Sequence, residues 1–415
     1  MTMRPYGTRG ITLALTCILP ALLLLPSTAS DQVAVHSVPP PVRSTVDPIA
    51  HRGCDHFYNM EFDQAISDFE TLVKAHPDDP FPDNYLLAAV IFKELYRIGA
   101  LESELYARET FLDKRPRRPL DPEVTRRVEQ LEARSEALAN AQLAKNPNNV
   151  DALYARGVVR SLRSTYMGLG QKAWWAAIRS ALAARRDHER VLQLDPTYVD
   201  AKMTVGMHNY IIGCMNWVQR LGASVIGITG SKQKGLDYLR EVAHSDTDAT
   251  WDARVALALF LRREQLYPEA TVLLRQMQVQ YPRSFLLSVE YGNLLNAAGH
   301  GEEAIAQFRK TIANQEAGKY QLSEPEMAWW GLGTALRGQR RFAEAAGAFD
   351  SAAATRGADP DVVARATLFA GEMYDTLGQR ELAQTRYRAL IASGGPGDDT
   401  ARRHQRQPYN YDRQH

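Results

Sequence analysis

The arrangement of hydrophobic and polar positions predicts α-helices along almost the whole chain from about residue 48 to residue 393. In this region apolar residues recur at the three- and four-residue spacing of one helix face. The alternating β-branched runs and Asn-Gly or Asp-Gly turns that would predict a sheet are missing from the sequence. Asp47-Pro48 predicts the first helix start, because Asp caps a helix well and Pro suits its first position. We therefore expect an all-α chain.

A fixed spacing repeats within these helices. In five units a small residue is followed twelve positions later by Ala and sixteen positions later by a large apolar residue. The units are Gly53/Ala65/Phe69, Ala258/Ala270/Leu274, Gly292/Ala304/Phe308, Gly333/Ala345/Phe349 and Gly371/Ala383/Tyr387. Two antiparallel helices approach closely only where both carry small side chains, so each unit predicts a helical hairpin. The large residue lies one turn beyond the Ala and is expected to fill the space to the next hairpin.

These units resemble the tetratricopeptide repeat (TPR) family, and the best of them carries Trp329, Leu332, Gly333, Phe342, Ala345 and Phe349. The resemblance covers about residues 48–393. It implies a right-handed superhelical solenoid of about seven antiparallel hairpins, irregular in its centre.

The predicted array has three regions, which are N-terminal hairpins over residues 48–146, an irregular central region over 147–245 and a C-terminal array over 246–393. In the centre, Pro147–Ala152 and Pro196–Ala201 repeat the same pattern. The unit between them is lengthened by a stretch from Arg160 to Trp175.

Both ends of the chain differ from the array. Arg4 and Arg9 precede an apolar run, and the small residues Ser27 and Ala29 follow it, so residues 1–29 are a predicted signal peptide cleaved near Ala29. The mature chain is then periplasmic or secreted, and the alternative is a chain anchored in the membrane by an uncleaved leader. Residues 30–47 are a predicted Pro-rich linker, and residues 394–415 a predicted disordered tail.

Composition and charge narrow the function. The apolar fraction of 45% and the charged fraction of 23% exclude a disordered or fibrous chain. A net charge of +1 provides no basic field for nucleic acid. We therefore expect a protein or peptide partner and no nucleic acid. The sequence gives no indication of the oligomeric state.

A central apolar segment, residues 205–230, contains only one formal charge, Arg220, together with five glycines. The favoured interpretation is a buried or partner-facing helix pair that the glycines allow to pack closely. Membrane contact is the alternative, although His208 and Asn209 argue against full insertion. The region resembles bacterial exported TPR proteins of unassigned function and, distantly, a eukaryotic inclusion-clearance TPR family of mitochondrial and lipid-droplet membranes. The residues that carry this likeness are Asp195-Pro196, Gly206-Met-His-Asn-Tyr210 and Gly230-Ser-Lys-Gln-Lys-Gly235-Leu236.

The sequence contains no recognisable catalytic motif. It lacks a Gly-x-Ser-x-Gly elbow, a His-Glu-x-x-His helix and a phosphate-binding loop of the Walker type, so we expect no enzyme activity and no cofactor. His51, Cys54 and Asp55 form at most a partial metal site, because His56 points away and a fourth ligand is missing. We expect two separate thiols at Cys54 and Cys214, with a disulfide as the alternative.

The implied binding surface is the concave face of the solenoid, which the first helix of each hairpin lines. The residues predicted on this face are Arg262, Asn293, Asn296, Trp330, Thr334, Arg337, Glu372 and Asp375. Asn side chains suit a peptide backbone, and Arg337 or Trp330 suits a side-chain anchor.

The predicted function is that of an exported, non-catalytic scaffold that binds peptide or helix segments in this groove. A membrane-peripheral protein that uses residues 205–230 is the first alternative. An enzyme or metal-binding protein is the second.

Overall fold

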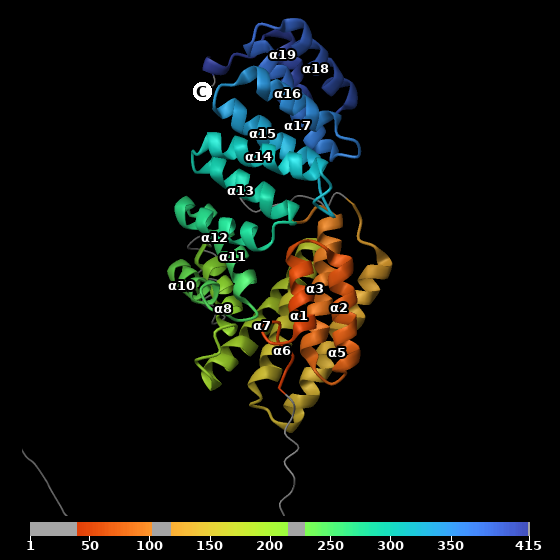
Figure 1. The fold of residues 1–415 in the computed structure, drawn as a ribbon, viewed down its shortest axis with the longest axis vertical. Coiled ribbons are helices and arrows are strands. Elements are labelled where there is room, and N and C mark those ends of the chain that lie inside the picture. Colours follow the sequence, from red (N-terminus) through yellow and green to blue (C-terminus); the bar gives the residue numbers. More distant parts are fainter. Residues whose placement is uncertain (1–39, 102–117, 215–228, 414–415) are drawn as a thin grey trace, which may run out of the picture. The chain divides into compact units, whose positions relative to one another are not determined.

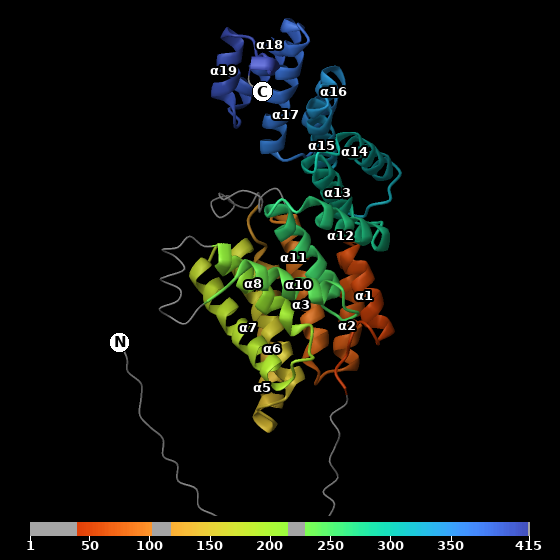
Figure 2. The ribbon, with the colours of Figure 1, turned by 90° about the vertical axis from the view of Figure 1, so that its left-hand side faces the viewer.

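The structure, a computed structural model, describes residues 40–101, 118–214 and 229–413. In these ranges the chain forms seventeen α-helices, a π-helical turn and a short 3-10 helix, and no strand (Figures 1 and 2). The predicted all-α fold is confirmed. The predicted signal peptide, residues 30–39 of the linker and residues 215–228 of the central apolar segment lie outside the described residues.

Helices that follow one another in sequence pair as antiparallel hairpins, and each hairpin packs against the next. The pairs are α1 (Pro48–Tyr58) with α2 (Phe62–Ala75), α3 (Pro80–Arg97) with α5 (Pro122–Lys145), α6 (Val150–Thr165) with α7 (Trp174–Leu194), α8 (Ala201–Cys214) with α10 (Lys232–Ala243), α11 (Thr250–Arg263) with α12 (Tyr267–Gln280), α13 (Phe285–Ala297) with α14 (Gly301–Glu316), α15 (Pro325–Gly338) with α16 (Phe342–Ala354), and α17 (Pro360–Thr376) with α18 (Arg380–Ser393). The described part of the chain thus holds one hairpin more than the seven or so expected. The central hairpins lack the small-residue spacing, so the pattern undercounts them.

Helix starts follow the capping residues. The Asp47 side chain accepts hydrogen bonds from the backbone N–H groups of Ile49 and Ala50, at 2.8 and 2.9 Å, with Pro48 in the first turn. Each of these bonds satisfies a donor that has no partner inside the helix. The start predicted at Asp47-Pro48 is therefore confirmed.

The repeated spacing places an aromatic ring over a glycine. A Cβ atom added to Gly292 would lie 2.7 Å from Cε1 of Phe308, which is closer than real Cβ contacts come. The same ring also lies against Gly331 of α15, in the next hairpin. Phe308 therefore fills the space to the next hairpin, as predicted, and in addition packs against the glycine of its own hairpin.

The lengthened central unit contains a change of helix type. The π-helical turn η2 (Tyr166–Gly170) follows α6 directly, and α7 begins at Trp174. Tyr166 is buried, and its hydroxyl lies 2.8 Å from Thr125 Oγ1 on α5. The buried tyrosine fixes the extra turn against the preceding hairpin.

The two ends of the described chain are more ordered than predicted. Residues beyond the last hairpin form α19 (Asp398–Arg406) and the 3-10 helix η3 (Tyr411–Arg413), and α19 packs against α18 (Figure 2). The prediction of a disordered tail over residues 394–415 is therefore wrong for these helices. The prediction rested on the polar composition of the tail and did not anticipate that Ala401 and Tyr409 pack into the structure, where they are only 0% and 3% exposed.

The last residues of the predicted linker are also packed. Val42 is buried, and its backbone N–H donates to Asp79 Oδ2 at 2.7 Å. Residues 41–47 therefore lie against the helices and do not form a free extended linker.

Candidate peptide-binding site

The eight predicted groove residues all lie on the first helices of the last four hairpins. Arg262 is on α11, Asn293 and Asn296 on α13, Trp330, Thr334 and Arg337 on α15, and Glu372 and Asp375 on α17. The structure brings three of them, Arg337, Glu372 and Asp375, against a common neighbour. That neighbour is the chain's own residues 404–412, which we call the C-terminal segment.

Tyr409 is the centre of the C-terminal segment. Its backbone N–H donates to Asp375 Oδ2 at 2.9 Å, and its hydroxyl accepts from Arg337 Nη2 at 3.2 Å. Three residues further on, Asp412 Oδ1 pairs with Arg340 Nη2 at 2.6 Å. Arg337 and Asp375, together with Arg340 just after α15, thus contact a phenol, a backbone N–H and a carboxylate of the residues between α19 and the end of η3.

Arg380 holds the beginning of the same segment. Its Nη2 donates to the backbone carbonyls of His404 and Gln405, both at 2.7 Å, and its Nη1 pairs with Asp375 Oδ1 at 2.8 Å. His404 Nε2 lies 3.5 Å from Glu372 Oε1. Asp375, whose side chain has 0% exposure, therefore joins Arg380 to the backbone of Tyr409.

Trp330, one of the two residues suggested as a side-chain anchor, is buried. Only 8% of it is exposed, because its ring stacks on Phe369 of α17 with 5.2 Å between centroids. The guanidinium of Arg365 lies 5.0 Å from the Trp330 ring and covers it further. Thr334 donates to the carbonyl of Trp330 at 2.9 Å, within its own helix. Trp330 belongs to the core between two hairpins.

The remaining candidates form a separate polar group around Glu290. Arg262 Nη1 pairs with Glu290 Oε2 at 3.2 Å, and Asn293 Nδ2 donates to Glu290 Oε1 at 3.5 Å. Asn296 is half-buried on the same helix as Asn293. The structure thus does not gather all eight candidates into one site.

A second segment of the chain is bound in a similar way, and sequence analysis missed it. Arg43, in residues 41–47, lies among three aromatic rings that we call the arginine cage: Phe81 of α3, Tyr154 of α6 and Tyr198. Its guanidinium carbon is 4.2, 5.5 and 5.4 Å from the three ring centroids, respectively. A cation over aromatic faces is attracted by the negative charge of the ring faces.

Three carboxylates surround the same guanidinium. Arg43 nitrogens lie 2.8 Å from Asp151, 3.5 Å from Asp248 and 3.9 Å from Asp200. The side chains of Asp200 and Asp248 are only 7% and 9% exposed. Burial raises the pKa of Asp200, although Arg43 acts to lower it. Arg43 Nη2 also donates to the hydroxyl of Tyr198, and this hydroxyl donates in turn to Asp151 Oδ1 at 3.0 Å.

The neighbours of Arg43 are bound too. Ser44 Oγ donates to Asp248 Oδ1 at 2.6 Å, and Tyr85 Oη donates to the other oxygen of Asp248 at 2.8 Å. The Ser44 backbone N–H donates to Tyr85 Oη at 3.2 Å. Because these partners lie up to 204 positions from Ser44, no local sequence pattern indicates the site.

The candidate metal residues have other partners. His56 Nδ1 lies 2.6 Å from Glu61, and Asp55 pairs with Arg283 at 2.9 Å. Burial raises the pKa of the Cys54 thiol, and both Cys54 and Cys214 are free thiols. Across residues 40–101, 118–214 and 229–413, no group of three or more His, Cys, Asp or Glu side chains is placed to hold a metal ion.

The described part of the central apolar segment is an ordinary hairpin helix. Tyr210 of α8 is buried and stacks on Phe260 with 3.9 Å between centroids, and its hydroxyl donates to Glu264 at 2.8 Å. Ile211, on the other side, is 50% exposed. Among the described helices, none has the length and apolar character needed to cross a membrane.

Stacked helical hairpins and these bound segments define a helical-repeat scaffold. The tetratricopeptide repeat family model matches residues 290–362, which run from α13 into the start of α17. Residues 290–362 are thus recognised as tetratricopeptide repeats, in agreement with the hairpin spacing along the chain. No curated protein matches the chain. The narrower likeness to exported and inclusion-clearance TPR proteins stays a prediction.

Several solved structures are similar to this chain at low identity. The Cut9–Hcn1 hetero-tetramer of APC/C is 14% identical over 88% of this chain and 56% of that chain, with a TM-score of 0.46. A TPR protein from Parabacteroides merdae is 12% identical over 82% and 98%, with a TM-score of 0.31. The human IFIT1 dimer with m7Gppp-AAAA is 13% identical over 83% and 76%, with a TM-score of 0.38. This chain spans little more than half of the matched Cut9–Hcn1 chain, 56% of its length.

Proposed function

We propose that this TPR protein is a non-catalytic scaffold that binds extended peptide segments of partner proteins on α15 and α17. The fold is one that serves protein–protein interaction. The observation that supports the proposal is the C-terminal segment, which already lies there as a peptide ligand would. Arg337 contacts a phenol, Arg340 a carboxylate and Asp375 a backbone N–H. A partner with an aromatic residue followed by an acidic one satisfies the same three groups.

A partner has to displace the C-terminal segment. That segment is part of the same chain, so its effective concentration at the groove is high, of the order of mM for a short flexible connection. Tyr409 is 3% exposed, which makes it the main apolar anchor. Binding of an external peptide is therefore expected to be weak in the native chain and tighter once the anchor is removed.

A peptide added in trans tests this arrangement. A fluorescein-labelled peptide with the sequence of residues 404–413 is titrated by fluorescence polarisation into the native chain and into the full-length variant Tyr409→Ala/Tyr411→Ala. We expect saturable binding to the variant, about tenfold or more tighter than to the native chain. Adding Arg337→Gln and Arg340→Gln to the same variant is expected to abolish it. No binding to Tyr409→Ala/Tyr411→Ala, when that variant keeps its helical circular dichroism, would overturn the proposal.

Crosslinking identifies the natural partner. A photo-crosslinking amino acid at Arg340, which lies at the C-terminal segment, is compared with one at Arg356, an exposed residue away from these contacts. Proteins trapped at Arg340 and not at Arg356 support a groove partner. Equal trapping at both positions contradicts it.

We also propose that the chain is exported to the periplasm or secreted. The support is the charged leader, the apolar run and the small residues before Ser30. N-terminal sequencing of the chain from the periplasmic fraction is expected to begin at Ser30. A chain that begins at Met1 and sediments with membranes indicates the uncleaved anchor instead.

A further inference from the structure

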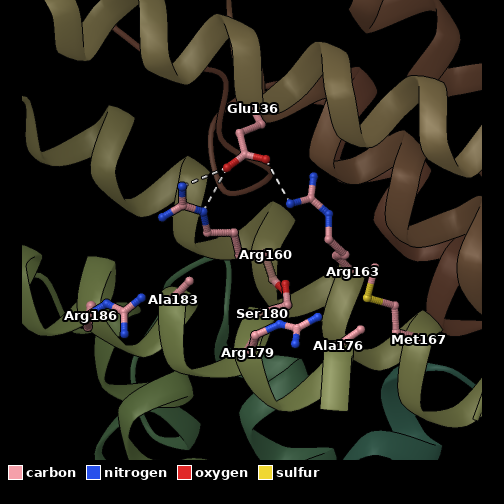
Figure 3. A pocket seen from close by; sticks show the side chains of 9 residues that line it. All are labelled: Glu136, Arg160, Arg163, Met167, Ala176, Arg179, Ser180, Ala183 and Arg186. Atoms are coloured by element: carbon pink, nitrogen blue, oxygen red, sulfur yellow. Dashed lines mark hydrogen bonds and ion pairs between the residues drawn. The ribbon is translucent and has the colours of Figure 1, made fainter. Parts of the chain in front are cut away.

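A cleft with an unusual concentration of arginines opens between α5, α6 and α7. Its volume is about 390 Å³. Glu136 of α5 with Arg160 and Arg163 of α6 lines one side, and Arg179 and Arg186 of α7 line the other (Figure 3). We call it the arginine cleft. It is separate from the contacts of the C-terminal segment.

The arginines on the α6 side are already neutralised. Glu136 pairs with Arg160 at 2.8 Å and with Arg163 at 2.9 Å. Asp187 pairs with Arg160 at 2.7 Å, and Glu132 with Arg163 at 3.0 Å. Burial acts to raise the pKa of Glu136, but the two guanidiniums lower it below its ordinary value, so this carboxylate is ionised at neutral pH. These groups form a rigid wall with little charge to offer a ligand.

The arginines on the α7 side are different. Arg179 and Arg186 are exposed, and among the described residues neither forms an ion pair or a hydrogen bond. They are seven positions apart on one helix, so about 10 Å separates them along the helix axis. A ligand that reaches both guanidiniums carries two acidic groups at about this distance. An acidic peptide meets that requirement, whereas a single phosphate ion does not.

An exposed apolar surface continues from these arginines along α7. Trp175 is 80% exposed and Ile178 is 48% exposed. From Trp174 to Arg186 the helix contains no Asp or Glu. Exposed Trp beside Arg is the combination that dominates binding energy at protein interfaces.

We propose that the arginine cleft and the adjoining face of α7 bind an acidic peptide segment of a partner protein, with carboxylates at Arg179 and Arg186 and an apolar residue on Trp175. This inference rests on the proposed scaffold function but uses a different surface. A carboxylate accepts two parallel hydrogen bonds from a guanidinium, so the pair has a defined geometry in addition to its charge attraction. A flat lipid surface suits the site less well, because the cleft lies between helices.

The test uses the full chain and a fluorescein-labelled helical peptide that carries Glu at seven-residue spacing with Leu between. We expect saturable binding that weakens about tenfold in Arg179→Gln/Arg186→Gln, since each exposed pair contributes modestly. Arg275→Gln/Arg356→Gln removes the same charge from exposed positions elsewhere and is expected to bind like the native chain. Trp175→Ala is expected to weaken binding as well.

Two results overturn the inference. The first is that the acidic peptide does not bind, or that Arg179→Gln/Arg186→Gln binds it as tightly as Arg275→Gln/Arg356→Gln does. The other is binding to vesicles that contain phosphatidylserine, lost in Arg179→Gln/Arg186→Gln, without binding of the peptide, which assigns this face to a membrane. The peptide of residues 404–413 distinguishes these failures from failure of the scaffold proposal, because its binding does not involve α7.

Discussion

Replacing Arg43 by Met removes the cation from the arginine cage while keeping most of the side-chain volume. The guanidinium lies 4.2 Å from the centre of the Phe81 ring and within ion-pair distance of Asp151, Asp200 and Asp248, and the Arg43 side chain is 18% exposed. Removing one partner of a buried ion pair costs about 3–5 kcal/mol. Because Asp151 is 40% exposed and screened by water, we expect the lower end, about 3 kcal/mol.

The loss is expected locally, since residues 41–47 are attached to the array chiefly through this side chain and its neighbours. A cost of about 3 kcal/mol corresponds to roughly 100-fold faster amide hydrogen exchange in residues 42–50. Exchange is measured by mass spectrometry of the native chain and the variant under identical conditions. Exchange also avoids the assumption of two-state unfolding, which long repeat arrays violate.

The dependence on pH gives a second signature. Burial already raises the pKa of Asp200, and without Arg43 its pKa is expected to rise further. A carboxyl whose pKa is higher in the folded state destabilises the fold at neutral pH, and this cost fades as the pH falls through that pKa. The difference between the variant and the native chain is therefore expected to shrink between pH 7 and about pH 4.

Arg52→Met is the matched control, because Arg52 also pairs with a carboxylate, Asp68 at 2.6 Å, but its side chain is 59% exposed. Its effect is expected to be too small to measure, as is usual for exposed ion pairs. If Arg43→Met changes exchange no more than Arg52→Met does, the arginine cage does not hold residues 41–47 against the helices.

Three further substitutions test the packing of a glycine and the burial of a histidine. Gly333→Ala is expected to destabilise the chain by about 1–3 kcal/mol, because the new Cβ would lie 2.7 Å from the ring of Phe349. Gly347 lies in the partner helix of the same hairpin, and nothing lies within 4 Å of a Cβ added there. Gly347→Ala is therefore expected to stabilise the chain by up to about 1 kcal/mol. A thermal melting temperature that is higher for Gly333→Ala than for Gly347→Ala would contradict this packing. Burial lowers the pKa of His188 to about 4 from its ordinary 6.5. As the pH falls, the imidazole is therefore protonated in the unfolded chain at a higher pH than in the folded chain. His188 therefore contributes stability above pH 6.5 that is lost as the pH falls towards 4, up to about 3 kcal/mol, and a urea midpoint with the same pH dependence in His188→Gln contradicts this.

The repeat architecture was predictable because its signals are local. Asp47-Pro48 fixes a helix start through hydrogen bonds within three residues. The spacing of a small residue, an alanine and a large apolar residue specifies five of the hairpins within sixteen positions. The helical periodicity of the repeats also predicted that Arg337 and Asp375 lie on the surface that the C-terminal segment contacts. It failed for Trp330, because the exposure of a residue on a first helix depends on how deeply the next hairpin packs, and Phe369 covers that ring.

Only the tertiary structure decided what the two ends of the array do. The C-terminal segment is polar, and its order comes from Arg380, Asp375 and Arg337, which lie on other helices. The arginine cage joins Arg43 to groups from several hairpins. A single sequence records which side chains a segment offers, but not which distant side chains meet it. The periodicity of the helices therefore determined the scaffold, whereas long-range charge and aromatic contacts determined which of its surfaces the chain itself occupies.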